Sequence, residues 1–156
     1  MRFLDVSKQR TDGSYDILAE ECFDLTPHRF VDLFTKKEHA AYFRDIGTYD
    51  SHTWIDLNTL DVHWTNKILW MSFPTGLRLT LDRQRKNISF TSIGSNQPSL
   101  IRGSWTTKPV TSTHTIVTLR QNVLLHKTPP LISIPYLLKK RVDRVFHDVH
   151  VFTKLE

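Results

Sequence analysis

The chain has 156 residues, of which 39% are hydrophobic and 24% are charged. This length fits a single domain over residues 1–156, and the composition excludes an intrinsically disordered chain. The formal net charge of +5 favours contact with anionic surfaces, namely lipid headgroups, nucleic acid or an acidic protein, without choosing among them.

The sequence also restricts the compartment. A single cysteine, Cys22, excludes an intramolecular disulfide framework and a multi-cysteine zinc site, which indicates a reducing environment. The first residues are too few and too polar for a signal peptide, and Ser133 and Pro135 interrupt the longest apolar run. We therefore expect a soluble intracellular protein of the cytoplasm or an organelle lumen, from which a transit peptide could have been removed.

The first predicted elements are one strand and two short helices. The segment Tyr15–Cys22 has β-compatible residues and follows a turn signal, so it predicts a strand. Thr26 is a good N-cap and Pro27 suits the first helical position, which predicts the start of a helix. A second short helical pattern follows and is predicted to end at Gly47.

A meander of six strands is predicted to follow. Short β-compatible runs are separated by Asn, Asp, Gly, Pro and Ser. The predicted strands are Trp54–Leu57, Lys67–Phe73, Leu77–Asp82, Ile88–Ile93, Leu100–Thr107 and Thr113–His126. Leu77, Leu79 and Leu81 alternate with polar residues, so one face of the sheet should be buried and the other solvated.

A long helix is predicted at the end of the chain. Apolar residues recur at helical spacing from Leu138 to Phe152, and Pro135 is tolerated only in a first turn. The helix should therefore begin near Ser133 or Pro135 and run to about Lys154. Its roughly twenty residues would reach about 30 Å, which is long enough to cover the apolar face of the sheet.

This order of elements resembles the helix-grip fold of the START-like (SRPBCC) superfamily, which includes the polyketide cyclase and coenzyme Q-binding families. The stretch Gly103-Ser104-Trp105, followed by Pro109 and a long strand from Thr113, is similar to the Gly-x-Trp strand of that superfamily. We predict an α+β fold with a strand, two short helices, a curved antiparallel sheet of about seven strands in total and a long C-terminal helix.

The resemblance implies a cavity between the sheet and the terminal helix that takes a hydrophobic small molecule, such as a lipid or a quinone. Strand parity and the helical stripe select the residues expected to face this ligand: Leu69, Met71, Phe73, Leu79, Leu81, Phe90, Trp105, Leu119, Val142 and Phe146. The alternative is a solid core that these side chains fill completely.

Motifs of the standard cofactor enzymes do not occur in the sequence. It has no Gly-x-Gly-x-x-Gly, Gly-x-x-x-x-Gly-Lys, Gly-x-Ser-x-Gly or His-Glu-x-x-His. We therefore expect no cofactor and no metal, and assign no catalytic residue. His147 and His150 are three residues apart on the terminal helix, and we interpret them as part of its polar face.

Three classes of function remain open. The first, which we favour, is a non-enzymatic carrier of a hydrophobic molecule, whose basic residues help it to dock on an anionic membrane. The second is a subunit or assembly factor that has no cavity and binds a protein partner through its basic surface. The third is a cyclase-like enzyme, for which the candidate inward polar groups are Tyr42, Tyr49, His63, Asp82 and Arg102.

Nucleic-acid binding is not excluded either. Two basic groups could contact phosphates: Arg83, Arg85 and Lys86, and Lys139, Lys140 and Arg141. However, the sequence has no RNA-binding motif with paired aromatic residues.

Overall fold

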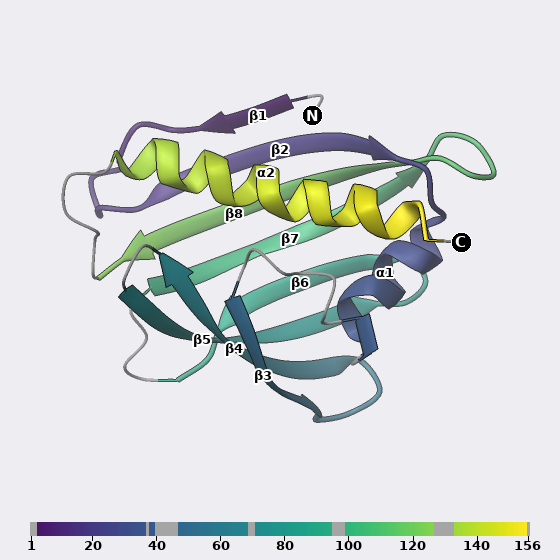
Figure 1. Cartoon of the computed structure of the whole chain (residues 1–156), viewed down its shortest axis with the longest axis horizontal. Coiled ribbons are helices and arrows are strands. Elements are labelled where there is room, and N and C mark those ends of the chain that lie inside the picture. Colours follow the sequence, from purple (N-terminus) through teal and green to yellow (C-terminus); the bar gives the residue numbers. More distant parts are fainter. Residues whose placement is uncertain are drawn as a thin grey trace.

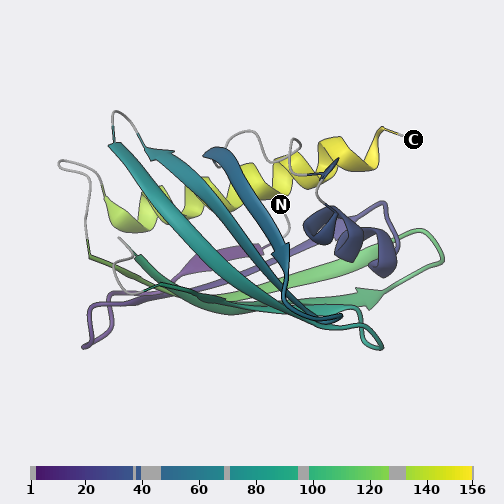
Figure 2. The same cartoon turned by 90° about the horizontal axis from the view of Figure 1, so that it is seen from below.

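The computed structural model describes residues 3–36, 38–39, 47–68, 71–94, 99–126 and 133–155. Within them, eight strands form one antiparallel sheet in the order β1-β2-β8-β7-β6-β5-β4-β3 (Figure 1). The strands are β1 (Phe3–Val6), β2 (Tyr15–Phe23), β3 (Gly47–Trp54), β4 (Thr59–Ile68), β5 (Met71–Asp82), β6 (Asn87–Ser92), β7 (Ser99–Pro109) and β8 (Thr115–Leu125). The helices are α1 (Pro27–Thr35) and α2 (Ile134–Thr153), and both lie on the same, inner side of the curved sheet (Figure 2).

An N-terminal strand and the last strand are neighbours in the sheet, because β2 pairs with β8 and not with β3. The β2–β8 register runs from Tyr15 opposite Val123 to Phe23 opposite Thr115. After β2 the chain enters α1 and then begins β3 at the opposite edge of the sheet. From β3 to β8 every strand pairs with the one that follows it, so these six strands form a meander. β2 and then β1 extend the sheet beyond β8.

The predicted two-faced sheet is confirmed on β5. Leu77, Leu79 and Leu81 are buried in the core, whereas Arg78 and Thr80 between them are exposed. Burial therefore follows the two-residue period of the strand.

Both helices begin as predicted. The Thr26 hydroxyl accepts a hydrogen bond from the Arg29 N–H at 3.2 Å and caps α1. The Ser133 hydroxyl accepts one from the Tyr136 N–H at 3.5 Å and caps α2, with Pro135 in its first turn. None of the helices in the described part of the chain is long and apolar enough to span a membrane.

Four expectations differ from the structure. The predicted total of about seven strands is wrong by one, because β1 is a four-residue edge strand with no sequence signal of its own. The predicted strand Trp54–Leu57 is wrong, since β3 ends at Trp54 and a turn follows. The predicted single strand Lys67–Phe73 is also wrong, because it combines the end of β4 with the start of β5. Gly47 begins β3, and most of the second predicted helix lies outside the described residues.

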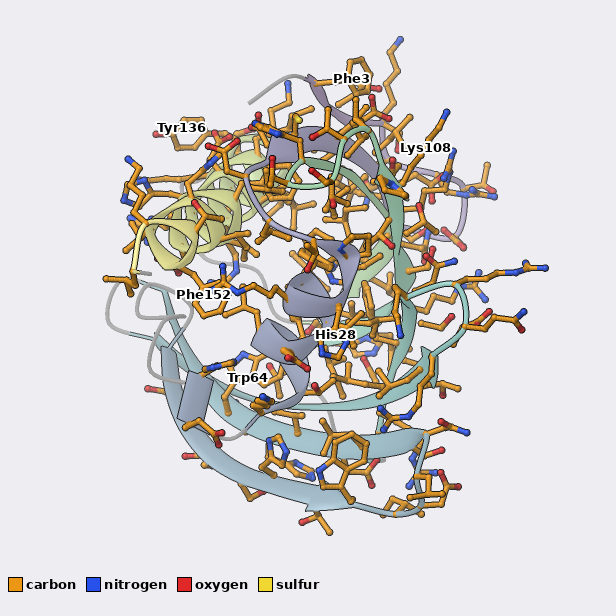
Figure 3. The ribbon with its side chains drawn as sticks, turned by 90° about the vertical axis from the view of Figure 1, so that its right-hand side faces the viewer. Phe3, His28, Trp64, Lys108, Tyr136 and Phe152 are labelled. Carbon is orange, nitrogen blue, oxygen red and sulfur yellow. The ribbon has the colours of Figure 1, made fainter. Side chains whose placement is uncertain are left out.

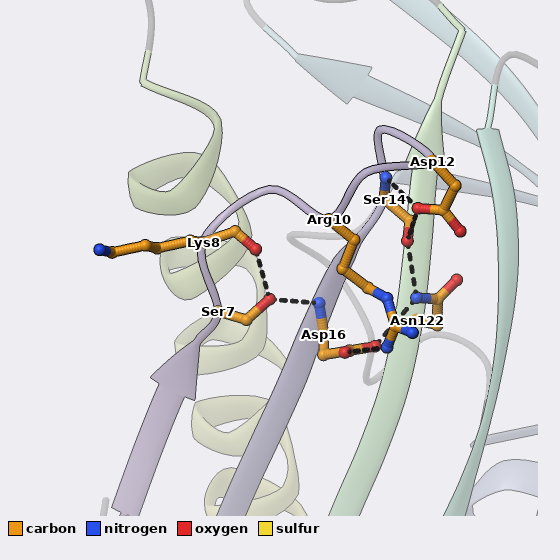
Figure 4. Close-up of polar contacts among 7 residues, drawn as sticks. All are labelled: Ser7, Lys8, Arg10, Asp12, Ser14, Asp16 and Asn122. Atoms are coloured by element: carbon orange, nitrogen blue, oxygen red, sulfur yellow. Dashed lines mark hydrogen bonds and ion pairs between the residues drawn. The ribbon is translucent and has the colours of Figure 1, made fainter.

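A network of side chains fixes the connection between β1 and β2 to the middle of the sheet (Figure 4). Asn122 on β8 donates its amide to Asp16 Oδ1 at 2.9 Å and to the Ser14 hydroxyl at 3.0 Å. Arg10 Nη1 donates to Asp16 Oδ2 at 2.6 Å. The hydrogen bonds from Asn122 and Arg10 hold the pKa of Asp16 below its ordinary value.

We expect Asn122→Ala to lower the free energy of unfolding by about 1 kcal/mol at neutral pH, since Asp16 is partly solvated. A depressed folded-state pKa contributes stability above the unfolded pKa, about 3.9, and this contribution is lost as the pH falls through the folded pKa. Urea unfolding of the two proteins should therefore give converging stabilities in acid. Thr91→Ala, at an exposed position of β6, should keep the wild-type profile. A difference between wild type and Asn122→Ala that is constant with pH would contradict the role of Asp16.

Candidate functional site

A continuous apolar row crosses the inner face of the sheet. Leu81, Ile88, Trp105, Leu119 and Ala19 are successive cross-strand partners from β5 to β2, and all five are buried. Neighbours on one face of a sheet pack against one another, so this row forms a dry inner wall.

An aromatic cluster closes the space between this wall and the two helices. Phe146 on α2 meets the ring of Phe23 edge-on at 5.5 Å between centroids and lies 5.9 Å from Trp105. Trp105 also contacts Phe30 and Phe34 of α1, at 5.6 and 5.2 Å. Edge and tilted ring contacts of this kind stabilise a fixed arrangement, so this part of the interior is a packed core.

The predicted ligand-facing residues are placed as follows. Seven of them are buried in the hydrophobic core: Leu79, Leu81, Phe90, Trp105, Leu119, Val142 and Phe146. Leu69 lies outside the described residues, and Met71 and Phe73 belong to β5 while their side chains lie outside the described part. Burial is equally typical of a core residue, so contact of these residues with a ligand stays a prediction.

The inner face is covered unevenly. The closest approaches of α2 to the sheet are to β1 and β2. Val62 and Trp64 on β4 are cross-strand partners of the buried residues Leu77 and Thr75, yet both are only half-buried. Figure 3 shows Trp64 on the same inner side of the curved sheet as Phe152 of α2. The inner face of β4 is therefore a part of the described interior that α2 does not seal.

A buried acidic residue lies under the flank of α2 that faces β2. Glu21 is the cross-strand partner of the fully buried Val117, and its Oε2 lies 3.8 Å from His150 Nε2. The His150 ring packs on Phe23 with 4.5 Å between centroids. His147 is exposed as predicted, whereas His150 is half-buried beside Glu21 and Phe23. His147 and His150 are at positions i and i+3 of α2, and only His150 faces the sheet.

The opposite flank of α2 also carries buried charge. Asp148 is buried and is two residues from His150, so on a helix the two side chains point to opposite flanks. Phe152 is on the same flank as Asp148. The centroid of its ring lies 4.7 Å from Arg29 Cζ and 5.1 Å from the centroid of the His39 ring. Charged groups in an apolar interior are costly unless a polar or oppositely charged group compensates their desolvation.

Arg141 shares this second flank, two turns before Asp148. Burial is the main cause that lowers the pKa of Arg141 from its ordinary value, and the neighbouring charge of Arg144 lowers it further. Glu21, Asp148 and Arg141 were not among the predicted site residues. Strand parity offers a signal for Glu21 alone, because it lies between the inner-facing residues Ala19 and Phe23.

The candidate polar groups for a cyclase-like enzyme do not converge. Gly76 is opposite His63, whose ring occupies the space above this glycine on the outer face. Arg102 is exposed on the outer face, and Asp82 is exposed at the end of β5. Tyr42 lies outside the described residues, as does the side chain of Tyr49.

The outer face has an open hollow of about 710 Å³ over β1, β2 and β6–β8, with Arg102 and Arg120 among its lining residues. It is on the opposite side of the sheet from the predicted cavity. In the described ranges, no group of three or more His, Cys, Asp and Glu residues is arranged to hold a metal ion.

No model of a known sequence family matches the chain, and no curated protein matches it. Solved structures match it over nearly its whole length. A STAR-related lipid transfer protein from Xanthomonas axonopodis is 9% identical and superposes with a TM-score of 0.75, covering 97% of this chain and 98% of that one. The Zhui aromatase/cyclase from Streptomyces sp. R1128 is 8% identical, with a TM-score of 0.66 and coverage of 90% and 94%.

A START superfamily protein from Mycobacterium smegmatis is 8% identical and has a TM-score of 0.67, covering 89% of this chain and 97% of that one. The chain therefore has the START-like helix-grip fold, as the order of its predicted elements indicated. At these identities the similarity establishes the fold alone, and the function has to be argued from the site.

Proposed function

We propose that the protein binds a hydrophobic small molecule, such as a lipid or a quinone, and acts as its carrier. The ligand would lie between the inner face of β3–β5 and the flank of α2 that carries Asp148. The observation that carries this proposal is the half-burial of Val62 and Trp64 on the inner face of β4, opposite the buried residues Leu77 and Thr75 of β5. An apolar wall that its own helix does not seal is a surface suited to an apolar ligand.

The ten predicted residues divide between two walls in this proposal. Leu79 and Leu81 of β5 would form the wall under the ligand, and the same place stays a prediction for Leu69, Met71 and Phe73, whose side chains lie outside the described part. Of the others, Phe90, Leu119 and Val142 would form the floor and the helix side, while Trp105 and Phe146 would support them from the aromatic cluster.

The names of two structural neighbours support this class of ligand, since one is a lipid transfer protein and another an aromatase/cyclase. Enzymatic activity is less well supported. The buried Glu21 and the half-buried His150 lie on the β2 side of α2, where His150 packs against Phe23, away from the proposed ligand. An acid or base must reach the reacting atoms, and this pair does not face them.

The proposal is tested by extracting the purified protein with organic solvent and analysing the extract by mass spectrometry, where an apolar molecule is expected. In parallel, the stripped protein is titrated with the fluorescent dye 1-anilinonaphthalene-8-sulfonate, an anion whose aromatic rings bind apolar sites. Val62→Asp introduces a charge into the ligand wall and should weaken dye binding about tenfold or more. The matched control Thr80→Asp introduces the same charge at an exposed position of β5 and should bind the dye as the wild type does.

Circular dichroism must first show that both variants keep the sheet. An extract without any apolar molecule, together with equal dye binding by Val62→Asp and the wild type, would overturn the proposal. A stripped protein that binds no dye would favour the cavity-less subunit or assembly factor.

A further inference from the structure

Exposed apolar side chains gather at one end of the sheet. In the described part of the chain, ten large hydrophobic residues are exposed, and four of them lie in or beside the turns at the end where α1 lies (Figure 1). These four are Trp54, Ile55 and Leu57 at the β3–β4 turn and Val110 at the β7–β8 turn. Leu57 is 82% exposed, the highest value among them. Single exposed apolar residues are common on protein surfaces, but a group of them indicates an interaction site.

The neighbouring β5–β6 turn is basic and is fixed to this apolar turn. Arg83 Nε donates to the Leu57 carbonyl at 3.1 Å and to Asn58 Oδ1 at 3.0 Å. The Arg83 guanidinium also lies over the Trp54 ring, 5.7 Å from its centroid. The Leu81 N–H donates to the Asn58 carbonyl at 2.8 Å. The two turns, Trp54–Asn58 and Arg83–Lys86, are therefore one structured surface, which we call the sheet tip.

The shape of the sheet tip is set by local hydrogen bonds. Asp56 Oδ1 accepts from the Asn58 N–H at 2.8 Å, and Asp82 Oδ1 accepts from the Arg85 N–H at 3.1 Å. Thr107 on β7 donates its hydroxyl to the Lys86 carbonyl at 2.8 Å. Because these bonds hold the backbone, the exposed side chains can be presented to a partner without ordering a flexible loop.

The charge of the sheet tip complements an anionic surface. Arg83, Arg85 and Lys86 are three cations against the two carboxylates Asp56 and Asp82. Arg85 is largely exposed, and its contact with Asp82 is long, at 3.9 Å. Lys108 adds a further exposed cation at the adjacent end of β7.

We propose that the sheet tip docks on an anionic lipid membrane. Ile55 and Leu57 enter the boundary between headgroups and acyl chains, while Arg85 and Lys86 contact lipid phosphates. Membrane binding increases with the apolar area buried and with the attraction of basic residues to anionic lipids, and the sheet tip supplies both. Phosphate contacts with a nucleic acid would use the cations and leave the aliphatic side chains without a partner. The inference does not depend on what the interior binds.

The test is co-sedimentation of the full chain with vesicles of phosphatidylcholine, with and without phosphatidylserine. The wild type should bind the anionic vesicles, and more weakly at high salt. Ile55→Ser/Leu57→Ser removes the apolar contribution and should weaken binding about tenfold or more. Arg85→Gln/Lys86→Asn removes two cations and should reduce both the binding and its dependence on salt; Asn at position 86 suits the positive φ of 59° found there.

The matched control is Val151→Ser/Lys140→Gln, which removes one exposed apolar residue and one exposed cation from α2. It should bind vesicles like the wild type. Equal binding by the wild type and both sheet-tip variants would overturn the proposal. A second result would also overturn it: the wild type binds no vesicles but binds a single-stranded RNA oligonucleotide, and Arg85→Gln/Lys86→Asn loses that RNA binding. Loss of vesicle binding in the sheet-tip variants with unchanged dye binding would separate this inference from the proposed ligand site.

Discussion

Replacing Gly103 by alanine should destabilise the protein by at least about 3 kcal/mol, because no movement of a side chain can make room for the new methyl group. A Cβ at Gly103 would overlap the Arg120 carbonyl oxygen and lie 2.9 Å from both Gln121 Cα and Phe90 Cζ. Two of these three atoms belong to the backbone of β8, so the pairing of β7 with β8 would have to shift. Urea or thermal unfolding measures the loss.

A double variant separates backbone overlap from crowding by the Phe90 ring. Phe90→Leu removes the ring atom but leaves the overlap with Arg120 and Gln121, so Gly103→Ala/Phe90→Leu should remain as unstable as Gly103→Ala. Ser104→Ala is the control on the same strand and should change the free energy of unfolding by less than about 0.5 kcal/mol. Recovery of stability in the double variant would show that the glycine serves the aromatic ring and not the strand pairing.

Gly103 also shows what a sequence motif can and cannot predict. The run Gly103-Ser104-Trp105 was recognisable as a pattern, and the structure explains its first and last residues. Gly103 leaves room for the close approach of the β8 backbone, and Trp105 packs in the aromatic cluster. The helix boundaries were predictable because Thr26 and Ser133 satisfy N–H groups that the helix itself leaves unpaired. Such local signals do not depend on distant parts of the chain.

The β4–β5 hairpin was not predictable in the same way. The segment Lys67–Phe73 contains no Gly, Pro, Asn or Asp, so nothing in it marks the change from one strand to the next. We predicted no strand between Leu57 and Lys67, although Leu60, Val62 and Trp64 alternate with polar residues and lie on β4 opposite Leu79, Leu77 and Thr75 of β5. The turn after Trp54 was missed, because Trp54–Leu57 was predicted as a strand, and the structure shows that the Asn58 N–H donates to Asp56 Oδ1 there.

The interior polar groups were hardest to predict. Glu21 and Asp148 are ordinary charged residues in the sequence, and only the pairing of β2 with β8 and the position of α2 bring them inside. Strand parity offers a signal for Glu21, but the position of α2, which lies against β1 and β2 more than a hundred residues away in the sequence, has no local signal. The sequence therefore predicts the apolar wall well, but it does not predict the charges within it.

Phe146→Ala should lower the free energy of unfolding by about 3–5 kcal/mol, the second of the two largest effects expected. Phe146 is 2% exposed and contacts both Phe23 and Trp105. Its removal leaves a void between α2 and the sheet that the surrounding rings cannot fill without losing their own contacts. Chemical denaturation measures the loss, and Lys140→Ala, at an exposed position of the same helix, should leave the stability nearly unchanged.

The comparison of Phe146 with Val62 distinguishes a packed core from a ligand wall. Val62 is half-buried, so Val62→Ala should cost less than about 1 kcal/mol in the stripped protein. A bound ligand stabilises the folded state by mass action, so loading should raise the melting temperature of the wild type more than that of Val62→Ala. Phe146→Ala should instead be destabilised by a similar amount whether the protein is loaded or stripped, because its void lies within the aromatic cluster. Val62→Ala could instead lower the free energy of unfolding of the stripped protein as much as truncation of a fully buried apolar residue does. The interior would then be solid on the β4 side as well, and the proposed ligand would have no binding site there.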